Sequence, residues 1–243
     1  TPDILKIKSG RHLALREHPL SLLSGKERKT NKVERLICIA IGYVFGLFQT
    51  AFIYGKLHGI DIRQHGSGNA GTTNTLRVLG TKAGLIVLLG DILKCIFAIV
   101  ICGVIFDASH QDEIYLLKLY AASGAILGHN FPFYLNFKGG KGIAATAGLI
   151  LSFHPAFIPM GVILFFGAFF ITHYVSLGSL LVYAGLMIEM IVAGQMGLFG
   201  SSQAVLIEMY IITALLTILA YYKHRENIKR LIAGNENKLS FKK

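Results

Sequence analysis

Charge is scarce in this chain, and acidic charge is scarcest. Asp, Glu, Lys and Arg together make up 15% of the 243 residues, with 13 acidic against 24 basic side chains. Hydrophobic residues make up 53%, and several long runs carry no charge. Each membrane-spanning helix needs about 20 mostly apolar residues. The composition therefore argues against a water-soluble domain and predicts an all-α, polytopic membrane protein.

Cysteine is also rare. The three cysteines, Cys38, Cys95 and Cys102, all fall within apolar runs, where cysteine usually behaves as a small buried hydrophobic residue. They lack the spacing of a disulfide framework or a zinc site, so no metal site is expected. The start of the chain also lacks the pattern of a cleavable signal peptide.

Seven apolar segments are predicted to cross the membrane. The fourth is the shortest, because its twelve residues would rise only about 18 Å as a helix, and His154-Pro155 separates it from the fifth. A single kinked helix over 142–172 would instead move every later loop to the other side. The predicted spans are 36–55, 83–106, 114–133, 142–153, 156–172, 175–193 and 204–222.

Two opposite charges lie inside the second predicted span. Asp91 and Lys94 are three residues apart and therefore share one face of a helix. A charge at the centre of a span costs about 2.5–3.5 kcal/mol. We expect these side chains to pair with each other or to face a polar cavity, with either a structural role or a role in the site. Glu189 and Glu208 fall towards the outer ends of their spans instead.

Positive charge is distributed unevenly about this seven-helix domain, residues 36–222. Thirteen Lys and Arg lie on one side, seven of them in the tail 223–243, and only Lys118 lies near the other side. Cytoplasmic loops are enriched in Lys and Arg, so we expect the first side to face the cytoplasm. Lipid headgroups and anionic ligands, not nucleic acid, then explain the net charge of +11. The basic N-terminal arm 1–35, with nine Lys and Arg, falls on the other side and is the exception.

A polar, glycine-rich loop, His65 to Arg77, separates the first two predicted spans. Glycines permit positive φ and close backbone approach, successive N–H groups can form an anion-binding nest, and arginine offers a planar fork for phosphate oxygens. The glycine spacing also matches a dinucleotide fingerprint, but that motif requires a strand–turn–helix unit, which the flanking spans exclude. We therefore predict a phosphate-binding loop. Its candidate residues are Gly66, Ser67, Gly68, Asn69, Gly71, Thr73, Asn74 and Arg77.

A second glycine-rich loop, Phe137 to Gly142, leads into the fourth predicted span. It lacks the spacing of a P-loop and the strand before it, so ATP hydrolysis is not expected. A basic loop before a helix N-terminus favours anions, either a substrate phosphate or a lipid headgroup. His129, at the end of the third span, is a candidate catalyst or a hydrogen-bonded helix end. The candidate residues here are His129, Lys138, Gly139, Gly140 and Lys141.

Two further segments are polar. The tail from His224 to Lys238 is basic, and on charge alone it could be only an anchor after the last span. The junction of the fifth and sixth spans holds Ser176 and Ser179, which could cap a helix or reach the same site.

Together these motifs resemble the bacterial membrane glycerol-3-phosphate acyltransferase family that takes its acyl group from acyl phosphate. The family's Gly-Ser-Gly-Asn-x-Gly-Ala-Thr-Asn-x-x-Arg pattern matches Gly66 to Arg77, and its Asp-Ile-Leu-Lys pattern matches Asp91 to Lys94. Gly-His-x-Phe/Trp-Pro begins at Gly128, followed by Phe-Lys-Gly-Gly-Lys-Gly, and the tail matches His-Arg-x-Asn-Ile-x-Arg-Leu followed by Gly-x-Glu-x-Lys. Order and spacing agree from about residue 36 to the end.

Some positions depart from the family pattern. Thr72 stands where alanine is usual, Asn235 replaces a common threonine, and Ile143 to Thr146 differ from the usual Val-Ala-Thr. The resemblance also says nothing about residues 1–35. The tail and junction residues that it adds to the candidate site are Ser176, His224, Asn227, Glu236 and Lys238.

The resemblance implies transfer of an acyl group from acyl phosphate to the 1-hydroxyl of glycerol 3-phosphate. The products are 1-acyl-glycerol 3-phosphate (lysophosphatidic acid) and phosphate, in phospholipid synthesis at the bacterial inner membrane. The active site would face the cytoplasm and need no cofactor, because acyl phosphate is already activated. A partner enzyme would make acyl phosphate. The His-x-x-x-x-Asp signature of the other large glycerolipid acyltransferase class is absent from the sequence.

The expected mechanism is direct attack of the 1-hydroxyl on the acyl carbonyl. Arg77 and Lys141 would clamp phosphates, while loop N–H groups and Ser67 or Asn74 would stabilise developing negative charge. There are two candidates for the general base, His129 and the phosphate of the substrate itself. The alternative function is a membrane carrier for phosphorylated metabolites, which would predict an inverted internal repeat. The sequence shows no such repeat.

The topology can be tested by cysteine labelling. Cysteines placed at Ser109 and Gln203 should react with an impermeant reagent on intact cells, and cysteines at Ser67 and Gly234 only after permeabilisation. Labelling of position 234 from outside would show that 142–172 crosses once and that the seven-span topology is wrong.

Overall fold

The computed structural model describes residues 30–239, and these residues form helices without strands. The N-terminal arm therefore lies outside the described residues, apart from its last six positions. Three short 3-10 turns lie between the α-helices, at Ile62–Gln64, Gln111–Glu113 and Phe133–Leu135. The helices are α1 (Lys32–Gly46), α2 (Thr50–Leu57), α3 (Thr72–Leu79), α4 (Thr81–Phe106), α5 (Ile114–Asn130), α6 (Ile143–Phe153), α7 (Phe157–Thr172), α8 (Val175–Gln195), α9 (Gln203–Lys223) and α10 (Arg225–Ile232).

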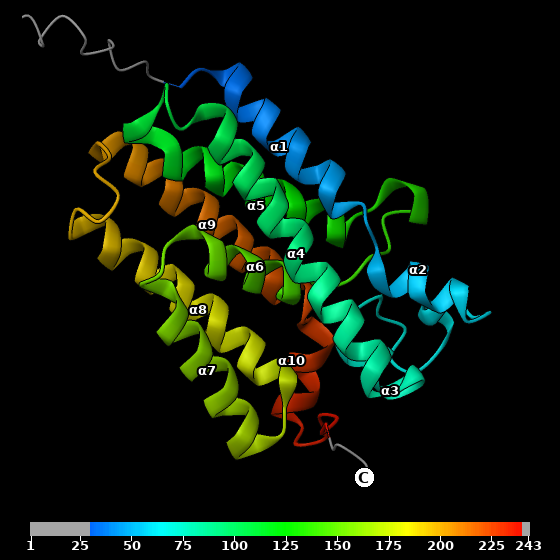
Figure 1. The fold of residues 1–243 in the computed structure, drawn as a ribbon. Coiled ribbons are helices and arrows are strands. Elements are labelled where there is room, and N and C mark those ends of the chain that lie inside the picture. Colours follow the sequence, from blue (N-terminus) through cyan, green and yellow to red (C-terminus); the bar gives the residue numbers. More distant parts are fainter. Residues whose placement is uncertain (1–29, 240–243) are drawn as a thin grey trace, which may run out of the picture.

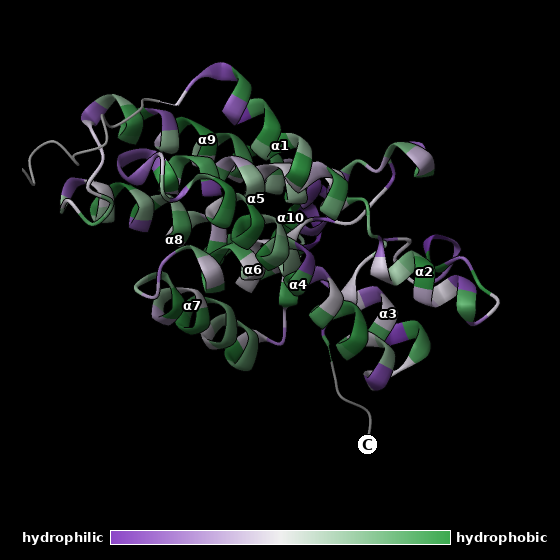
Figure 2. Cartoon of the chain, turned by 45° about the horizontal axis from the view of Figure 1, so that its top comes forward, coloured by the Kyte–Doolittle hydropathy of each residue, from purple (hydrophilic) through white to green (hydrophobic). Residues whose placement is uncertain are grey.

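The long helices lie side by side, and α5 occupies the centre of the bundle. It packs against α1, α4, α6 and α9, while α7 packs on α8 and α6. The short helices α2, α3 and α10 lie together at one end (Figure 1). In Figure 2 the long helices are mostly hydrophobic, and hydrophilic residues gather at their ends and on α3. This is the expected pattern for a bundle whose sides face lipid and whose ends face water.

The structure confirms the all-α membrane class. Within residues 30–239, four stretches are long and apolar enough to cross a membrane, namely Lys32–Leu57, Thr81–Phe106, Val175–Gln195 and Gln203–Lys223, and α6 and α7 are shorter apolar helices. The count of seven spans stays a prediction. The span predicted over 36–55 falls within Lys32–Leu57, but it is interrupted, because α1 ends at Gly46 and α2 begins at Thr50. The sequence around this break is apolar except for Gln49 and Thr50, so hydropathy alone does not reveal it.

The first described residues lie at the end of the bundle opposite α3 and α10. The Thr30 N–H donates to Glu113 Oε2 at 3.0 Å, and His110 Nε2 lies 3.3 Å from Glu34 Oε2. Residues 30–34 therefore share an end with the acidic loop 107–113. The side of the membrane on which the arm lies stays a prediction.

Helices α1 and α5 approach so closely that side chains cannot fit between them. A Cβ at Gly42 would lie 2.0 Å from the Ala121 carbonyl oxygen, and one at Gly124 would lie 2.2 Å from the Ile39 carbonyl oxygen. Gly46 and Gly128, one turn further along each helix, are equally enclosed by the partner backbone. Small residues four apart are the usual means of close helix packing in membranes. This contact holds the C-terminal half of α1 against α5 at the centre of the bundle.

We expect Gly124→Ala to lower the melting temperature of the detergent-solubilised protein, because the new methyl group meets backbone that cannot move aside. Overpacking of this kind costs about 1–3 kcal/mol or more. Gly167→Ala is the matched control, since nothing lies within 4 Å of a Cβ at that helical position. A melting temperature for Gly124→Ala equal to that of Gly167→Ala would contradict this packing.

Candidate active site

The three sequence motifs surround one cavity of about 360 Å³. It lies at the end of the bundle where α3, α6, α8 and α10 begin, so segments more than 150 residues apart in the sequence share one wall. The candidate residues that line it are Ser67, Asn69, Gly71, Thr73, Asn74, Arg77, His129, Lys141, Ser176, His224, Asn227 and Glu236. The candidates outside the lining are Gly66, Gly68, Lys138, Gly139, Gly140 and Lys238.

The cavity has a polar end and an apolar end. The polar end is formed by the motif residues, and the apolar end lies between α4, α6 and α7. Polar groups fix the orientation of a ligand in such a site, while apolar walls bind hydrocarbon. The apolar lining residues include Leu88, Ile92, Ala147, Leu151, Ile158, Val162, Phe165 and Phe166.

Asn74 holds the first glycine-rich loop together. Its Oδ1 accepts the Ser67 N–H at 2.8 Å, and its Nδ2 donates to the carbonyls of Ile62 and His65 at 3.1 and 3.0 Å. The amide expected to stabilise negative charge is thus occupied by the loop itself. Gly66 has φ +60°, and a Cβ there would lie 2.3 Å from Asn74 Oδ1. Gly66 therefore shapes the loop from behind the cavity wall.

The second glycine-rich loop lies flat on the C-terminal end of α5. The Gly139 and Gly140 N–H groups donate to the carbonyls of Asn130 and His129 at 3.2 and 3.1 Å. A Cβ at Gly140 would lie 2.1 Å from His129 Nε2 and 2.8 Å from the carbonyl oxygen of Ala70, so this glycine also brings the two loops into contact. The close approach places the next residue, Lys141, in the cavity wall, whereas Lys138 is exposed outside it.

The C-terminal tail completes the polar end. Lys141 Nζ donates to Asn227 Oδ1, and Asn227 Nδ2 donates to Glu236 Oε1 at 3.0 Å. Arg230 Nε donates to Glu236 Oε2 at 3.0 Å, and Arg77 Nη2 donates to the Asn237 carbonyl at 3.1 Å. The tail is therefore part of the site and not only an anchor. Lys238 lies outside the lining, with its ammonium 5.9 Å from the centre of the Tyr174 ring.

Several polar lining residues were not in the predicted set, among them Arg230, Asn237 and Thr72. Arg230 and Asn237 both belong to the tail, and Arg230 also matches the second arginine of the family's His-Arg-x-Asn-Ile-x-Arg-Leu pattern. Thr72 also lines the cavity, and its hydroxyl is buried without a partner among residues 30–239. The Ser176 hydroxyl is likewise buried and unpaired in the described chain, and α8 begins without a side-chain cap. The helix-capping alternative for Ser176 is therefore wrong.

Burial and mutual repulsion weaken the basicity of the cavity's titrating groups. Desolvation, followed by the nearby charge of Arg230, lowers the pKa of Lys141 to about 8. Burial, followed by the charge of Lys141, lowers the pKa of His224 to about 4, so this ring is neutral at pH 7. His224 Nδ1 lies 2.8 Å from the Ala220 carbonyl oxygen and donates to it, which leaves Nε2 as an acceptor. A bound anion would reduce the repulsion among these cations and would therefore stabilise the site.

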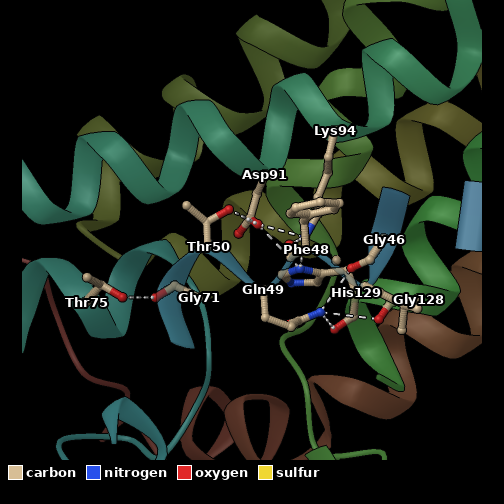
Figure 3. Close-up of polar contacts among 12 residues, drawn as sticks. Gly46, Phe48, Gln49, Thr50, Gly71, Thr75, Asp91, Lys94, Gly128 and His129 are labelled. Carbon is tan, nitrogen blue, oxygen red and sulfur yellow. Dashed lines mark hydrogen bonds and ion pairs between the residues drawn. The ribbon is translucent and has the colours of Figure 1, made fainter. Parts of the chain in front are cut away.

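A buried ionic network borders the cavity (Figure 3), and two of its members, Asp91 and His129, line it. Lys94 Nζ lies 2.8 Å from Asp91 Oδ1 and 2.8 Å from His129 Nδ1, and it donates to the Phe48 carbonyl at 2.8 Å. The Thr50 hydroxyl donates to the same Asp91 oxygen at 3.2 Å. The expected pairing of Asp91 with Lys94 is confirmed. Within the described range, no three His, Cys, Asp or Glu side chains lie together where they could hold a metal ion.

Comparison with known proteins agrees with this geometry. The sequence model of the family described as glycerol-3-phosphate acyltransferase matches residues 36–234. The chain belongs to this acyltransferase family. A glycerol-3-phosphate acyltransferase of Mycoplasmopsis synoviae is 38% identical over 218 residues, covering 84% of this chain and 93% of the relative. One of Halalkalibacterium halodurans is 41% identical over 202 residues, covering 83% and 93%.

Solved structures of the family show the same fold. The glycerol 3-phosphate form of PlsY (YgiH), an integral membrane glycerol 3-phosphate acyltransferase, superposes with a TM-score of 0.73 at 30% identity. Its lysophosphatidic acid form superposes with a TM-score of 0.71 at 29% identity. Each comparison covers 85% of this chain and 96% of the solved one. The shared family extends from α1 into the tail that completes the cavity.

Proposed function

We propose that this protein transfers an acyl group from acyl phosphate to the 1-hydroxyl of glycerol 3-phosphate, releasing 1-acyl-glycerol 3-phosphate and inorganic phosphate. The observation that carries the proposal is one cavity that is cationic at one end and apolar at the other. Both substrates carry a phosphate, and one carries a hydrocarbon chain. A single site with these two ends can hold both reacting groups next to each other.

The phosphates are bound by cations that come from three different segments. Arg77 follows the first loop, Lys141 ends the second loop, and Arg230 lies in α10, with Glu236 neutralising part of their charge. Hydrogen bonds between charged groups are roughly twice as strong as neutral ones. Lys141 also stands directly before α6, whose N-terminal N–H groups favour an anion in the same place. Ser67 and nearby loop N–H groups are placed to stabilise charge that develops on the acyl carbonyl.

The acyl chain occupies the apolar end between α4, α6 and α7. Burial of each methylene group contributes about 0.8 kcal/mol, so a long chain supplies most of the affinity without any specific contact. The acyl carbonyl then lies where the apolar and polar linings meet. No cofactor takes part, because the bond to phosphate already activates the acyl group.

Compartment and partners follow from the same proposal. The cavity end faces the cytoplasm of a bacterial inner membrane, where the thirteen Lys and Arg of that side would lie. Residues 36–222 form the membrane domain, and 223–243 form a cytoplasmic tail that contributes to the site. The basic arm proposed for residues 1–35 runs into α1, which begins at Lys32. An enzyme that makes acyl phosphate supplies the donor.

Reconstituted protein in proteoliposomes should release phosphate only when acyl phosphate and glycerol 3-phosphate are both present. Radiolabelled glycerol 3-phosphate should appear in lipid and should not accumulate in the lumen. Accumulation without acyl phosphate would instead identify a carrier. In this assay Lys141→Ala should lower kcat/KM by about 10- to 200-fold, the value of one hydrogen bond to a charged group. Lys138→Ala is the matched control and should lose much less, because Lys138 is exposed outside the cavity.

The charge of Lys141 predicts a loss of activity at alkaline pH. With a pKa of about 8 in the free enzyme, Lys141 is cationic below pH 8 and neutral above it. We expect kcat/KM for glycerol 3-phosphate to fall as pH rises from 7 to 9.5. Lys141→Arg should have lower activity, because the larger, planar guanidinium group of arginine replaces the compact ammonium group of lysine. Its profile should be flat over this range, since arginine stays charged. The same alkaline fall in Lys141→Arg would assign the titration to another group.

A further inference from the structure

The ammonium group of Lys94 has all of its hydrogen-bonding capacity in use. Three acceptors lie 2.8 Å from Nζ: Asp91 Oδ1, the Phe48 carbonyl oxygen and His129 Nδ1. Lys94 is 4% exposed and His129 is 3% exposed, so water does not compete for these bonds. An ammonium carries three N–H donors and no acceptor. Each donor therefore has one partner.

This arrangement determines where His129 carries its proton. Nδ1 must offer a lone pair to the ammonium, because a proton on Nδ1 would oppose an N–H of Lys94 and leave that donor unpaired. A neutral imidazole carries one proton, which then lies on Nε2. A doubly protonated ring is excluded by the same contact. His129 is thus a neutral imidazole that can only donate from Nε2.

The donating nitrogen lies next to the loop that brings Lys141 into the cavity wall. His129 lines the cavity, and its Nε2 lies where a Cβ of Gly140 would be, against the second glycine-rich loop. Nε2 has no hydrogen-bond partner in the described part of the chain, although Nδ1 is fully engaged. Lys141, the next residue of this loop, also lines the cavity. A phosphate oxygen at this place would accept from both the imidazole and the ammonium.

We propose that Lys94 is a positioning residue of the active site: it holds His129 as a neutral imidazole whose Nε2–H donates to a phosphate oxygen of a bound substrate. This proposal rests on the proposed function and removes His129 as its general base, because Nε2 has no lone pair in the ring plane to receive a proton. The proton of the attacking hydroxyl must leave to another group. The absence of a side chain at Gly140 leaves the space that this edge of the ring occupies.

Asp91 explains why a cation is needed behind the ring. Its Oδ1 lies 3.6 Å from His129 Nδ1, so in the absence of Lys94 the carboxylate would attract a proton to Nδ1. The tautomer would then reverse, and Nε2 would turn a lone pair towards an anionic phosphate. Lys94 prevents this reversal by occupying the space between the two groups and binding both.

The tautomer can be measured directly on the full-length protein in nanodiscs with ¹⁵N-labelled histidine. Signals of His129 are assigned as those that disappear in His129→Gln, and His110→Gln at the opposite end of the bundle serves as the assignment control. We expect a neutral Nε2–H ring at position 129, and an Nδ1–H ring in Lys94→Met. An Nδ1–H tautomer or an imidazolium at His129 in the wild-type protein would overturn the proposal, whether or not Lys94→Met folds.

Kinetics separate donation from a purely structural role. His129→Gln keeps an acceptor for Lys94 and an N–H donor for the ligand, whereas His129→Leu keeps neither. His129→Leu should lower kcat/KM by about 10- to 200-fold, and His129→Gln should restore most of that loss. An increase in KM for acyl phosphate alone would place the bond on the donor phosphate, and an increase for glycerol 3-phosphate alone on the acceptor phosphate. Equal activity of the Leu and Gln variants would contradict the proposal.

The two proposals can fail separately. The NMR measurement uses no substrate, so an Nε2–H ring in a protein that releases no phosphate would contradict the proposed function alone. An active protein with an Nδ1–H ring would contradict this inference alone. His110→Gln should keep wild-type activity, since His110 lies far from the cavity beside Glu34.

Discussion

The bundle must satisfy backbone carbonyls where two of its helices stop inside the protein. α1 ends at Gly46 and α5 ends at Asn130, and both ends are enclosed by other helices. In a membrane interior each unpaired backbone group costs several kcal/mol. Gln49 donates to the carbonyls of Gly46, Gly128 and His129 at 3.1–3.2 Å, and Lys94 donates to that of Phe48. These two side chains make the broken first span possible, and the break sends the chain out to the first glycine-rich loop.

The site depends on this break and on the contact between α1 and α5. The glycines of that contact hold α5 in a fixed position, and the end of α5 carries both His129 and the carbonyls that receive the second loop. The first loop meets the second at Ala70 and Gly140. The tail then joins both loops through Asn227, Glu236 and Asn237. A defect in the packing of α1 would therefore be transmitted to the phosphate site.

The sequence predicted the membrane class, the three motifs and the pairing of Asp91 with Lys94, because each depends on local composition or spacing. It could not show the break after Gly46, since the compensating donors come from Gln49 and from Lys94 on another helix. The sequence also did not reveal how Gly66 and Gly140 contribute to the site. Both were expected to touch ligand, but each acts by leaving room for a neighbouring side chain, Asn74 or His129. Such roles depend on tertiary distances that spacing does not encode.

The two ends of the cavity draw their ligands from different phases. Glycerol 3-phosphate dissolves in water, so its supply to the polar end is a bulk concentration. Under the proposed function, a long-chain acyl phosphate would partition into the bilayer, because each methylene adds about 0.8 kcal/mol, and would reach the apolar end of the cavity between α4, α6 and α7 from lipid. Its supply is therefore a mole fraction of the membrane. The same amount of donor would saturate the enzyme in a small membrane area and starve it in a large one, so growth of the bilayer itself would dilute the substrate.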